Sequence, residues 1–168
     1  LFLRVARHIG GRTPAMRPEL ERALRGDLGV LLPQRSRGGI ARVGKLADLG
    51  RVARDEGGFL GGAIRYWPVR IGTAPVLLLG PVAVHPTAQG EGLGGALIRD
   101  TLHSAAKDWD RVLLVGDLPY YRRFGFDRLE GVEMPPPTNS DRILGLALRD
   151  GAWDGVFGEV ESVRSHTG

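Results

Sequence analysis

Residues 75–98 read PVLLLGPVAVHPTAQGEGLGGALI, and this stretch decides how the rest of the chain is arranged. Residues 75–84 are an apolar run that predicts a buried strand, and residues 85–88 are a short polar loop. Residues 89–95 are rich in glycine and lead into apolar residues at helical spacing. The stretch therefore predicts a strand, a glycine-rich turn and an amphipathic helix from about 92 to 107.

The glycine-rich turn has the composition of an anion site. Four of the six residues from 90 to 95 are glycines, namely Gly90, Gly92, Gly94 and Gly95. Without Cβ atoms, such a turn lets an anion approach the backbone N–H groups, and the following helix adds the partial positive charge of its N-terminus. We interpret the turn as a pyrophosphate-binding site.

The flanking segments predict an α/β fold with a mixed sheet. Residues 49–71 have the pattern of a β-hairpin, and residues 111–115 (RVLLV) form a second buried strand after the helix. A strand–helix–strand unit implies that its two strands pair in parallel. A short helix at 118–125 and a strand at 142–149 follow. We expect six or seven strands, mostly antiparallel, with helices on the sheet and a parallel pair at its centre.

The bulk composition predicts a single domain over residues 1–168, working in the cytoplasm. There is no cysteine, which excludes disulfides and thiolate chemistry, and no apolar run long enough to span a membrane. Residues 1–54 hold twelve Lys or Arg against four Asp or Glu. A basic segment can bind nucleic acid, but these arginines are scattered and have no aromatic residues between them. We therefore interpret them as a solvated surface, with a short strand at 1–6 and a helix at 17–26.

Two well-known phosphate-binding motifs are alternative interpretations of the glycine-rich turn, and both fit it poorly. A Walker loop ends in Gly-Lys-Ser/Thr, whereas Gly95 is followed by Ala96 and Leu97. The G-x-G-x-x-G fingerprint of dinucleotide-binding domains is met by Gly90, Gly92 and Gly95. That fingerprint follows its strand directly, but here residues 85–89 intervene and antiparallel strands come first. The context therefore argues against NAD.

Two motifs together resemble the GNAT superfamily of N-acetyltransferases. Gln89, Gly92 and Gly94 match the family's acetyl-CoA loop, Gln/Arg-x-x-Gly-x-Gly/Ala, and residues 120–126 (YYRRFGF) resemble its Tyr-x-x-x-Gly-Phe helix. The longer stretches around these motifs, residues 77–98 and 116–126, are similar to those of one bacterial subgroup of predicted acetyltransferases. The resemblance is close over residues 49–126 and loose over 127–160, and it leaves residues 1–48 unplaced.

The resemblance implies that acetyl-CoA is the co-substrate. Its pyrophosphate would lie on the N–H groups of the turn, and its arm would lie along the edge of the preceding strand, in a wedge where the two parallel strands splay apart. A β-bulge near Gly80-Pro81 would help to open this wedge. The cofactor-binding residues implied are Val82, Ala83, Val84, Gln89, Gly90, Glu91, Gly92, Leu93, Gly94, Gly95 and Tyr120.

The resemblance also implies a catalytic acid, which aligns with Tyr121. A phenol of pKa near ~10 stays protonated at neutral pH and can donate a proton to the departing thiolate. No base is evident, because His85, in a loop before proline, is expected to be exposed, and His103, on the helix, is expected to be a surface or packing residue. The histidines have no metal-ligand spacing, so no metal is expected.

The function expected is acetyl-CoA-dependent N-acetylation of a primary amine, by direct attack in a ternary complex. The alternative is a non-catalytic acyl-CoA-sensing domain on the same fold. Arg65, Tyr66, Trp67 and Arg70 are candidates for an acceptor pocket, although strand alternation leaves at most two of them on one face. The acceptor is not identified, and neither membrane nor nucleic-acid binding is expected. The resemblance also allows a homodimer, since dimers are common in the family.

Overall fold

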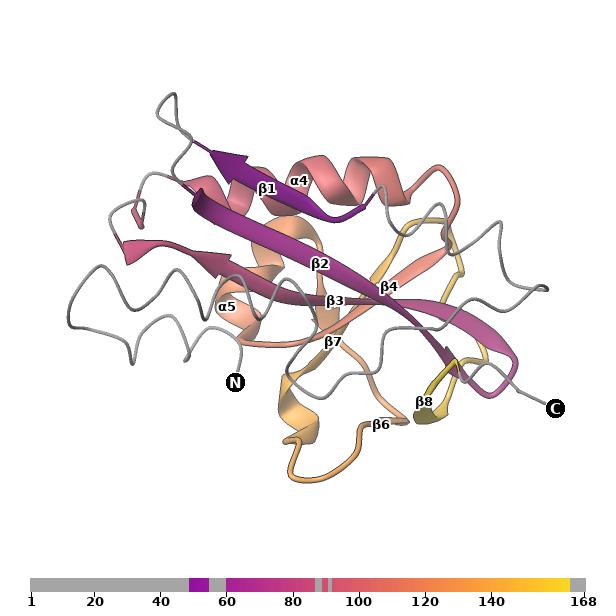
Figure 1. The fold of residues 1–168 in the computed structure, drawn as a ribbon. Coiled ribbons are helices and arrows are strands. Elements are labelled where there is room, and N and C mark those ends of the chain that lie inside the picture. Colours follow the sequence, from indigo (N-terminus) through magenta and orange to yellow (C-terminus); the bar gives the residue numbers. More distant parts are fainter. Residues whose placement is uncertain (1–48, 55–59, 87–88, 91, 164–168) are drawn as a thin grey trace, which may run out of the picture.

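The chain folds into a mixed sheet with helices packed against it (Figure 1). The computed structural model describes residues 49–54, 60–86, 89–90 and 92–163. The strand predicted at 1–6 and the helix predicted at 17–26 lie outside this part of the chain. No helix within it is long and apolar enough to span a bilayer. The elements in order are β1 (Arg51–Arg54), β2 (Leu60–Ile71), β3 (Ala74–Val84), α4 (Leu93–Ala105), β4 (Arg111–Val115), α5 (Leu118–Tyr121), η2 (Arg122–Phe124), β5 (Asp127–Arg128), β6 (Val132–Glu133), η3 (Ser140–Arg142), β7 (Ile143–Ala147) and β8 (Gly158–Ser162).

The sheet has the mixed topology that the sequence predicts. Its strand order is β5-β7-β4-β3-β2-β8-β6, with β1 paired to β2 beside this path. Over the described residues, five of the seven pairings are antiparallel, and β3–β4 and β6–β8 are parallel. The parallel pair β3–β4 lies at the centre, as expected. The count reaches eight strands because two-residue strands, β5 and β6, extend the sheet.

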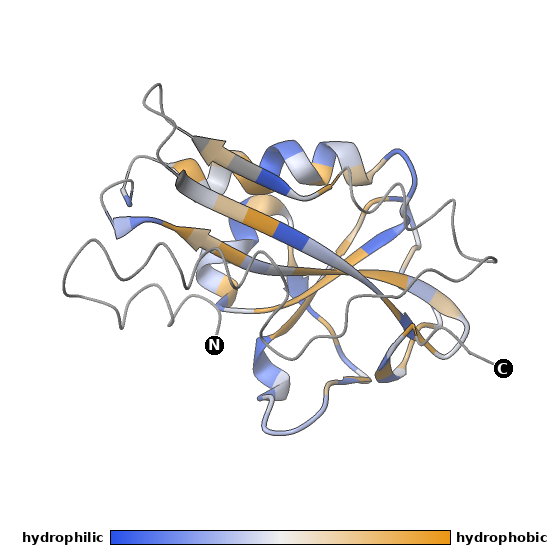
Figure 2. Ribbon diagram, in the orientation of Figure 1, coloured by the Kyte–Doolittle hydropathy of each residue, from blue (hydrophilic) through white to orange (hydrophobic). Residues whose placement is uncertain are grey.

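Both faces of the central strands are buried, which explains their unbroken apolar runs. On β3, Leu77 and Leu79 belong to the core cluster shared with α4, while Val76 and Leu78 pack in a second cluster on the other face. This alternation is the two-residue period of a strand, and a strand covered on both sides has no polar face. Figure 2 shows apolar residues along β3, whereas α4 carries both polar and apolar residues. The helix covers one face, and the C-terminal segment including Trp153 covers the other.

The parallel strands β3 and β4 separate soon after they meet. Their pairing joins Leu77 to Val112 and Leu78 to Leu113 and goes no further, although β3 continues to Val84 and β4 to Val115. The splayed central pair expected from the resemblance is therefore present. Beyond the paired residues, the β3 edge that faces β4 has no neighbouring strand within the described chain.

A β-bulge in β3 accompanies this separation. Ile64 of β2 pairs with Val82, whereas Tyr66 pairs with Leu79, so β3 has one more residue than β2 over this interval. The additional residue falls at Gly80-Pro81, as predicted, and Gly80 has a φ of 141° that favours glycine. The indole Nε1 of Trp67 donates a hydrogen bond of 2.7 Å to the Gly80 carbonyl.

Candidate active site

The backbone of β3 presents polar groups to the open side of the sheet. The His85 N–H donates to the Gly61 carbonyl at 2.7 Å, which makes these two a hydrogen-bonded pair of the β2–β3 ladder. In an antiparallel ladder such pairs alternate with pairs whose N–H and C=O groups point away. Ala83, which is opposite Ala63, therefore bonds to β2, and Val82 and Val84 direct their backbone groups toward the gap. Of these three predicted cofactor contacts, Val82 and Val84 have the orientation that an extended ligand arm needs.

The glycine-rich turn is tied to the end of this strand. Gly90 and Gly92 have φ values of 89° and 78°, in the left-handed region that glycine adopts without steric cost. The side-chain amide of Gln89 donates to the Val84 carbonyl at 3.2 Å, so the family-motif glutamine fixes the turn against β3. Gly90 and Gly92 are exposed, and Glu91 lies outside the described residues.

Helix α4 begins in this turn with its N-terminal N–H groups uncapped. Gly92 is the N-cap residue and offers no side chain, and the first turn holds no acidic residue. The first helical hydrogen bond runs from Ala96 N–H to the Gly92 carbonyl at 3.0 Å, so the N–H groups of Leu93, Gly94 and Gly95 have no acceptor within the helix. Such donors at a helix start, with glycines around them, can bind a phosphate group.

Helix α5 brings two tyrosines to the other side of the gap. Asp117 is its N-cap residue, and the η2 turn that follows ends at Gly125, which has a φ of 91°. The hydroxyl of Tyr120 lies 3.5 Å from the position that a Cβ on Gly94 would occupy, so this ring reaches the first turn of α4. Tyr121 turns inward and is buried, with its ring centroid 4.9 Å from that of Tyr120.

The Tyr121 ring packs against the chain at the end of β4, and its phenol stays protonated. A Cβ on Gly116 would lie 2.3 Å from Cε2 of Tyr121, so the ring rests directly on that glycine. Burial, aided by the neighbouring Tyr120 and Asp117, raises the pKa of Tyr121 to about 12, while Arg142 acts in the opposite direction. No group in the described chain hydrogen-bonds its hydroxyl. The phenol is therefore a protonated donor at physiological pH. Sequence reasoning did not single out Gly116.

His85 differs from its expected exposure. Only 5% of its surface is accessible, and its backbone N–H continues the β2–β3 ladder by donating to the Gly61 carbonyl. The surface position expected for it is therefore wrong. His103 is exposed on α4, as expected.

The four residues of β2 proposed to line an acceptor pocket divide between different environments. Tyr66 is buried and its hydroxyl lies 2.8 Å from Thr101 Oγ1 on α4, so it belongs to the core. Arg70 is ion-paired with Glu161 of β8, near the other end of the strand. Arg65 lies over the Trp67 ring at 4.8 Å, and Trp67 holds the bulge. Arg65 and Trp67 thus lie beside one another on one face of β2.

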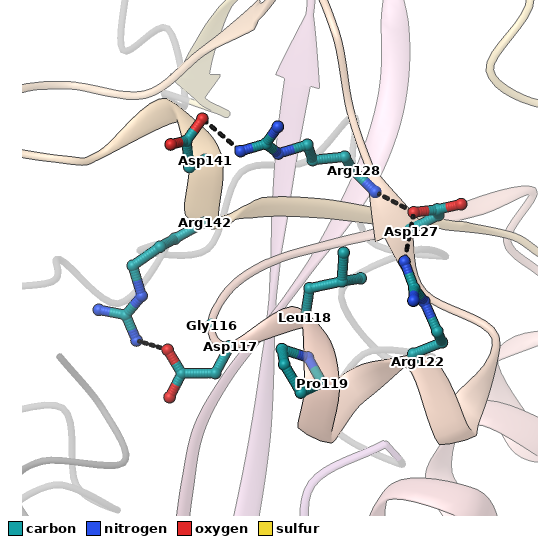
Figure 3. A pocket seen from close by; sticks show the side chains of 9 residues that line it. All are labelled: Gly116, Asp117, Leu118, Pro119, Arg122, Asp127, Arg128, Asp141 and Arg142. Carbon is teal, nitrogen blue, oxygen red and sulfur yellow. Dashed lines mark hydrogen bonds and ion pairs between the residues drawn. The ribbon is translucent and has the colours of Figure 1, made fainter.

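A pocket of about 600 Å³ is lined by Gly116 and by residues of α5, η2, β5 and η3 (Figure 3). Three arginines and three aspartates line it, so its formal charge is balanced. Each arginine faces an aspartate: Arg142 meets Asp117 at 3.1 Å, Arg122 meets Asp127 at 3.9 Å, and Arg128 meets Asp141. The pocket shares Gly116 and Asp117 with the surroundings of the Tyr121 ring.

Comparison with known proteins places this geometry in a family. An acetyltransferase (GNAT) domain model matches residues 49–128. A GNAT-family acetyltransferase from Brucella melitensis, solved with acetyl-CoA, is 30% identical, with 89% of this chain and 91% of that chain covered and a TM-score of 0.56. The chain belongs to the GNAT acetyltransferase family. The family assignment, like the fold, was expected from the two motifs.

Further structures agree with this assignment. The GNAT N-acetyltransferase YhbS from Escherichia coli, solved with CoA, has a TM-score of 0.65 at 25% identity, covering 90% of this chain and 86% of its own. Arabidopsis thaliana Naa50, solved with a bisubstrate analogue, is 16% identical over 82% of this chain and 95% of its own, with a TM-score of 0.50, and supports the fold alone. No curated protein sequence matches the chain. Membership of the GNAT family supports acyl transfer as the general activity.

Proposed function

We propose that this chain transfers an acetyl group from acetyl-CoA to a primary amine, by direct attack in a ternary complex. The observation that carries the proposal is the gap between β3 and β4, which has backbone donors and acceptors on one side and a neutral tyrosine on the other. The YhbS and Brucella structures, solved with CoA and acetyl-CoA, support this choice of co-substrate.

The cofactor would lie across the glycine-rich turn and along β3. Its pyrophosphate would accept hydrogen bonds from the N–H groups of Gly90 to Gly95, which no acidic side chain in the first turn of α4 opposes. Its amide-bearing arm would pair with the backbone of Val82 and Val84, as an added strand would. The Gln89 side chain already donates a hydrogen bond to the Val84 carbonyl. The groups available to the arm are therefore the Val84 N–H and the N–H and C=O of Val82.

In the transfer step, the amine nitrogen attacks the thioester carbonyl carbon and the carbon–sulfur bond breaks. The Tyr121 phenol donates its proton to the leaving thiolate, and the nitrogen releases a proton to water. The phenolate then takes up a proton from solvent, which restores the phenol. The phenol is protonated at neutral pH, so it holds a proton that it can give as negative charge develops on the sulfur. The amine is proposed to arrive neutral or to lose its proton to an ordered water.

The variant Tyr121→Phe tests this assignment. We expect kcat to fall by about 10²–10⁴-fold, the usual contribution of a positioned acid, with the Kd for CoA unchanged because the ring remains packed on Gly116. Thiol release would report turnover across a panel of amines, and calorimetry would report affinity. Tyr120→Phe is the matched control: it removes the neighbouring hydroxyl of a predicted cofactor contact and should retain kcat, whatever its effect on the KM for acetyl-CoA. Full activity in Tyr121→Phe would refute the acid role.

The same measurements separate the enzyme from a non-catalytic acyl-CoA sensor. A sensor would bind acetyl-CoA but release no thiol with any amine, and Tyr121→Phe would then leave every measured property unchanged. The 30% identity to a GNAT-family acetyltransferase from Brucella melitensis, solved with acetyl-CoA, favours the enzyme.

A further inference from the structure

Two arginines beside the glycine-rich turn differ from the other arginines that the structure describes. Most of those face a carboxylate, in the ion pairs made by Arg51, Arg70, Arg111, Arg122, Arg128, Arg142 and Arg149. Arg99 and Arg123 have no carboxylate partner within the described chain, and each lies over an aromatic ring instead. These two guanidinium groups are therefore positive charges without a counter-charge from that part of the protein.

Arg99 bends back toward the start of α4. Its Cζ atom lies 5.1 Å from the centre of the Phe124 ring, and its Nη1 lies 3.2 Å from where a Cβ on Gly95 would be. Helical side chains lean toward the N-terminus of their helix, which explains how a residue one turn later covers Gly95. The charge is consequently held beside the N–H groups of the first helical turn.

Arg123 is held on the other aromatic ring of this group. Its Cζ atom lies 4.5 Å from the centre of the Tyr120 ring, and its Nε donates to the Tyr120 carbonyl at 2.9 Å. The ring of Tyr120 lies 5.6 Å from that of Phe124, and these two rings face Gly94 and Gly95. One aromatic pair, packed on the turn, thus orders both arginines.

This arrangement suits a dianion that lies outside the turn itself. Neither guanidinium faces a carboxylate of the described chain, so a phosphate monoester that accepts hydrogen bonds from them would supply the missing negative charge. Guanidinium groups match phosphate oxygens in geometry, and stacking on rings lowers the entropy lost when they bind. The N–H groups of the turn satisfy a diphosphate, so the arginines would serve a second phosphate group on the same molecule.

We infer that Arg99 and Arg123 bind the 3′-phosphate of coenzyme A and make the site select CoA over 3′-dephospho-CoA. The inference rests on the proposed function, because it assumes that the diphosphate of CoA occupies the glycine-rich turn. The reacting thioester lies at the other end of the cofactor. The two arginines therefore set affinity and KM for acetyl-CoA and leave kcat unaffected.

The experiment compares CoA with 3′-dephospho-CoA by calorimetry, on wild type, Arg99→Gln, Arg123→Gln and the double variant. Wild type should bind CoA more tightly, and each single variant should lose about tenfold in CoA affinity, which corresponds to one charge-assisted contact. Affinity for 3′-dephospho-CoA should stay constant throughout, which also shows that each variant is folded. The double variant should bind both ligands equally.

Arg149→Gln is the matched control, since it removes an exposed arginine whose partner is Asp110 and should leave the preference intact. Raising the salt concentration should shrink the wild-type preference, because exposed charges are screened. Equal wild-type affinity for the two ligands overturns the inference while leaving the proposed function in place. Equal loss for both ligands in Arg99→Gln and Arg123→Gln also overturns it. Absence of binding to either ligand overturns the proposed function itself.

Discussion

The Tyr121 ring and the Gly116 backbone are in direct contact at the end of β4. A Cβ atom on Gly116 would stand 2.3 Å from Cε2 and 2.8 Å from Cδ2 of that ring, closer than any real contact allows. Gly116 is buried, and its N–H donates to the Arg142 carbonyl at 2.9 Å, so its backbone is fixed as well. The position of the proposed acid therefore depends on a residue that contributes no functional group.

Gly116→Ala should consequently reduce kcat by displacing the phenol. A misplacement of about 1 Å can cost about 10²-fold in rate, and we expect a loss of that order with little change in CoA affinity. Steady-state kinetics and calorimetry measure the two quantities. Gly145→Ala is the control, since its Cβ would lie 2.6 Å from Leu129, a clash that does not involve Tyr121. Equal loss of kcat in both variants would show that general destabilisation, and not displacement of Tyr121, lowers the rate.

Proline substitutions along β3 should separate cofactor binding from sheet stability. Val84→Pro removes an N–H that points into the gap, so acetyl-CoA affinity should fall by about tenfold or more while the fold tolerates the change. Ala83→Pro removes an N–H that bonds to β2, so it should lower the free energy of unfolding. Calorimetry and urea unfolding report the two effects. Similar loss of stability in both variants would contradict the alternation assigned here.

Alkaline pH should destabilise the protein through its buried tyrosines. Burial raises the pKa of Tyr121 to about 12 and raises that of Tyr66 as well. Below about pH 10, these phenols are protonated in both folded and unfolded chains. Above it, only the unfolded chain loses the proton readily, so the free energy of unfolding should fall as pH rises toward 12, by about 2–3 kcal/mol from Tyr121.

Urea unfolding at several pH values from 8 upward measures this loss. Tyr121→Phe and Tyr66→Phe should each flatten the alkaline decline, because phenylalanine has no proton to release. A decline of unchanged steepness in both variants would assign the pH dependence to other groups.

A double-mutant cycle should show that Tyr66 and Thr101 are coupled. Thr101 Oγ1 donates to the Leu97 carbonyl at 2.7 Å, so the Tyr66 hydroxyl, 2.8 Å away, donates to Thr101. Thr101→Val leaves that buried hydroxyl without an acceptor and should cost about 1–3 kcal/mol in the free energy of unfolding. After Tyr66→Phe the same change should cost less, because the hydroxyl is gone. Strictly additive losses would refute the coupling.

Much of the architecture could be read from local pattern. The apolar runs at 75–84 and 111–115 correspond to the central parallel strands. They can be recognised from sequence because a strand buried on both faces is apolar along most of its length. The last strand, Gly158–Ser162, has no clear sequence signal, because it is short and polar and its place is set by pairing with β2 and β6. The burial of His85 does not follow from its place before a proline, because burial depends on the segments that surround a residue in the folded chain.

The glycine-rich turn, the strand that precedes it and the position of Tyr121 on its helix follow from local sequence, since each depends on neighbouring residues. Which backbone groups of β3 face the gap, and the support that Gly116 gives to the Tyr121 ring, depend on the folded arrangement. The folded arrangement also shows that Arg99 and Arg123 flank the turn without a carboxylate partner in the described chain. The physical reason is that periodicity and turn chemistry act over a few residues. Burial, charge pairing and strand register depend on segments that meet only when the chain is folded.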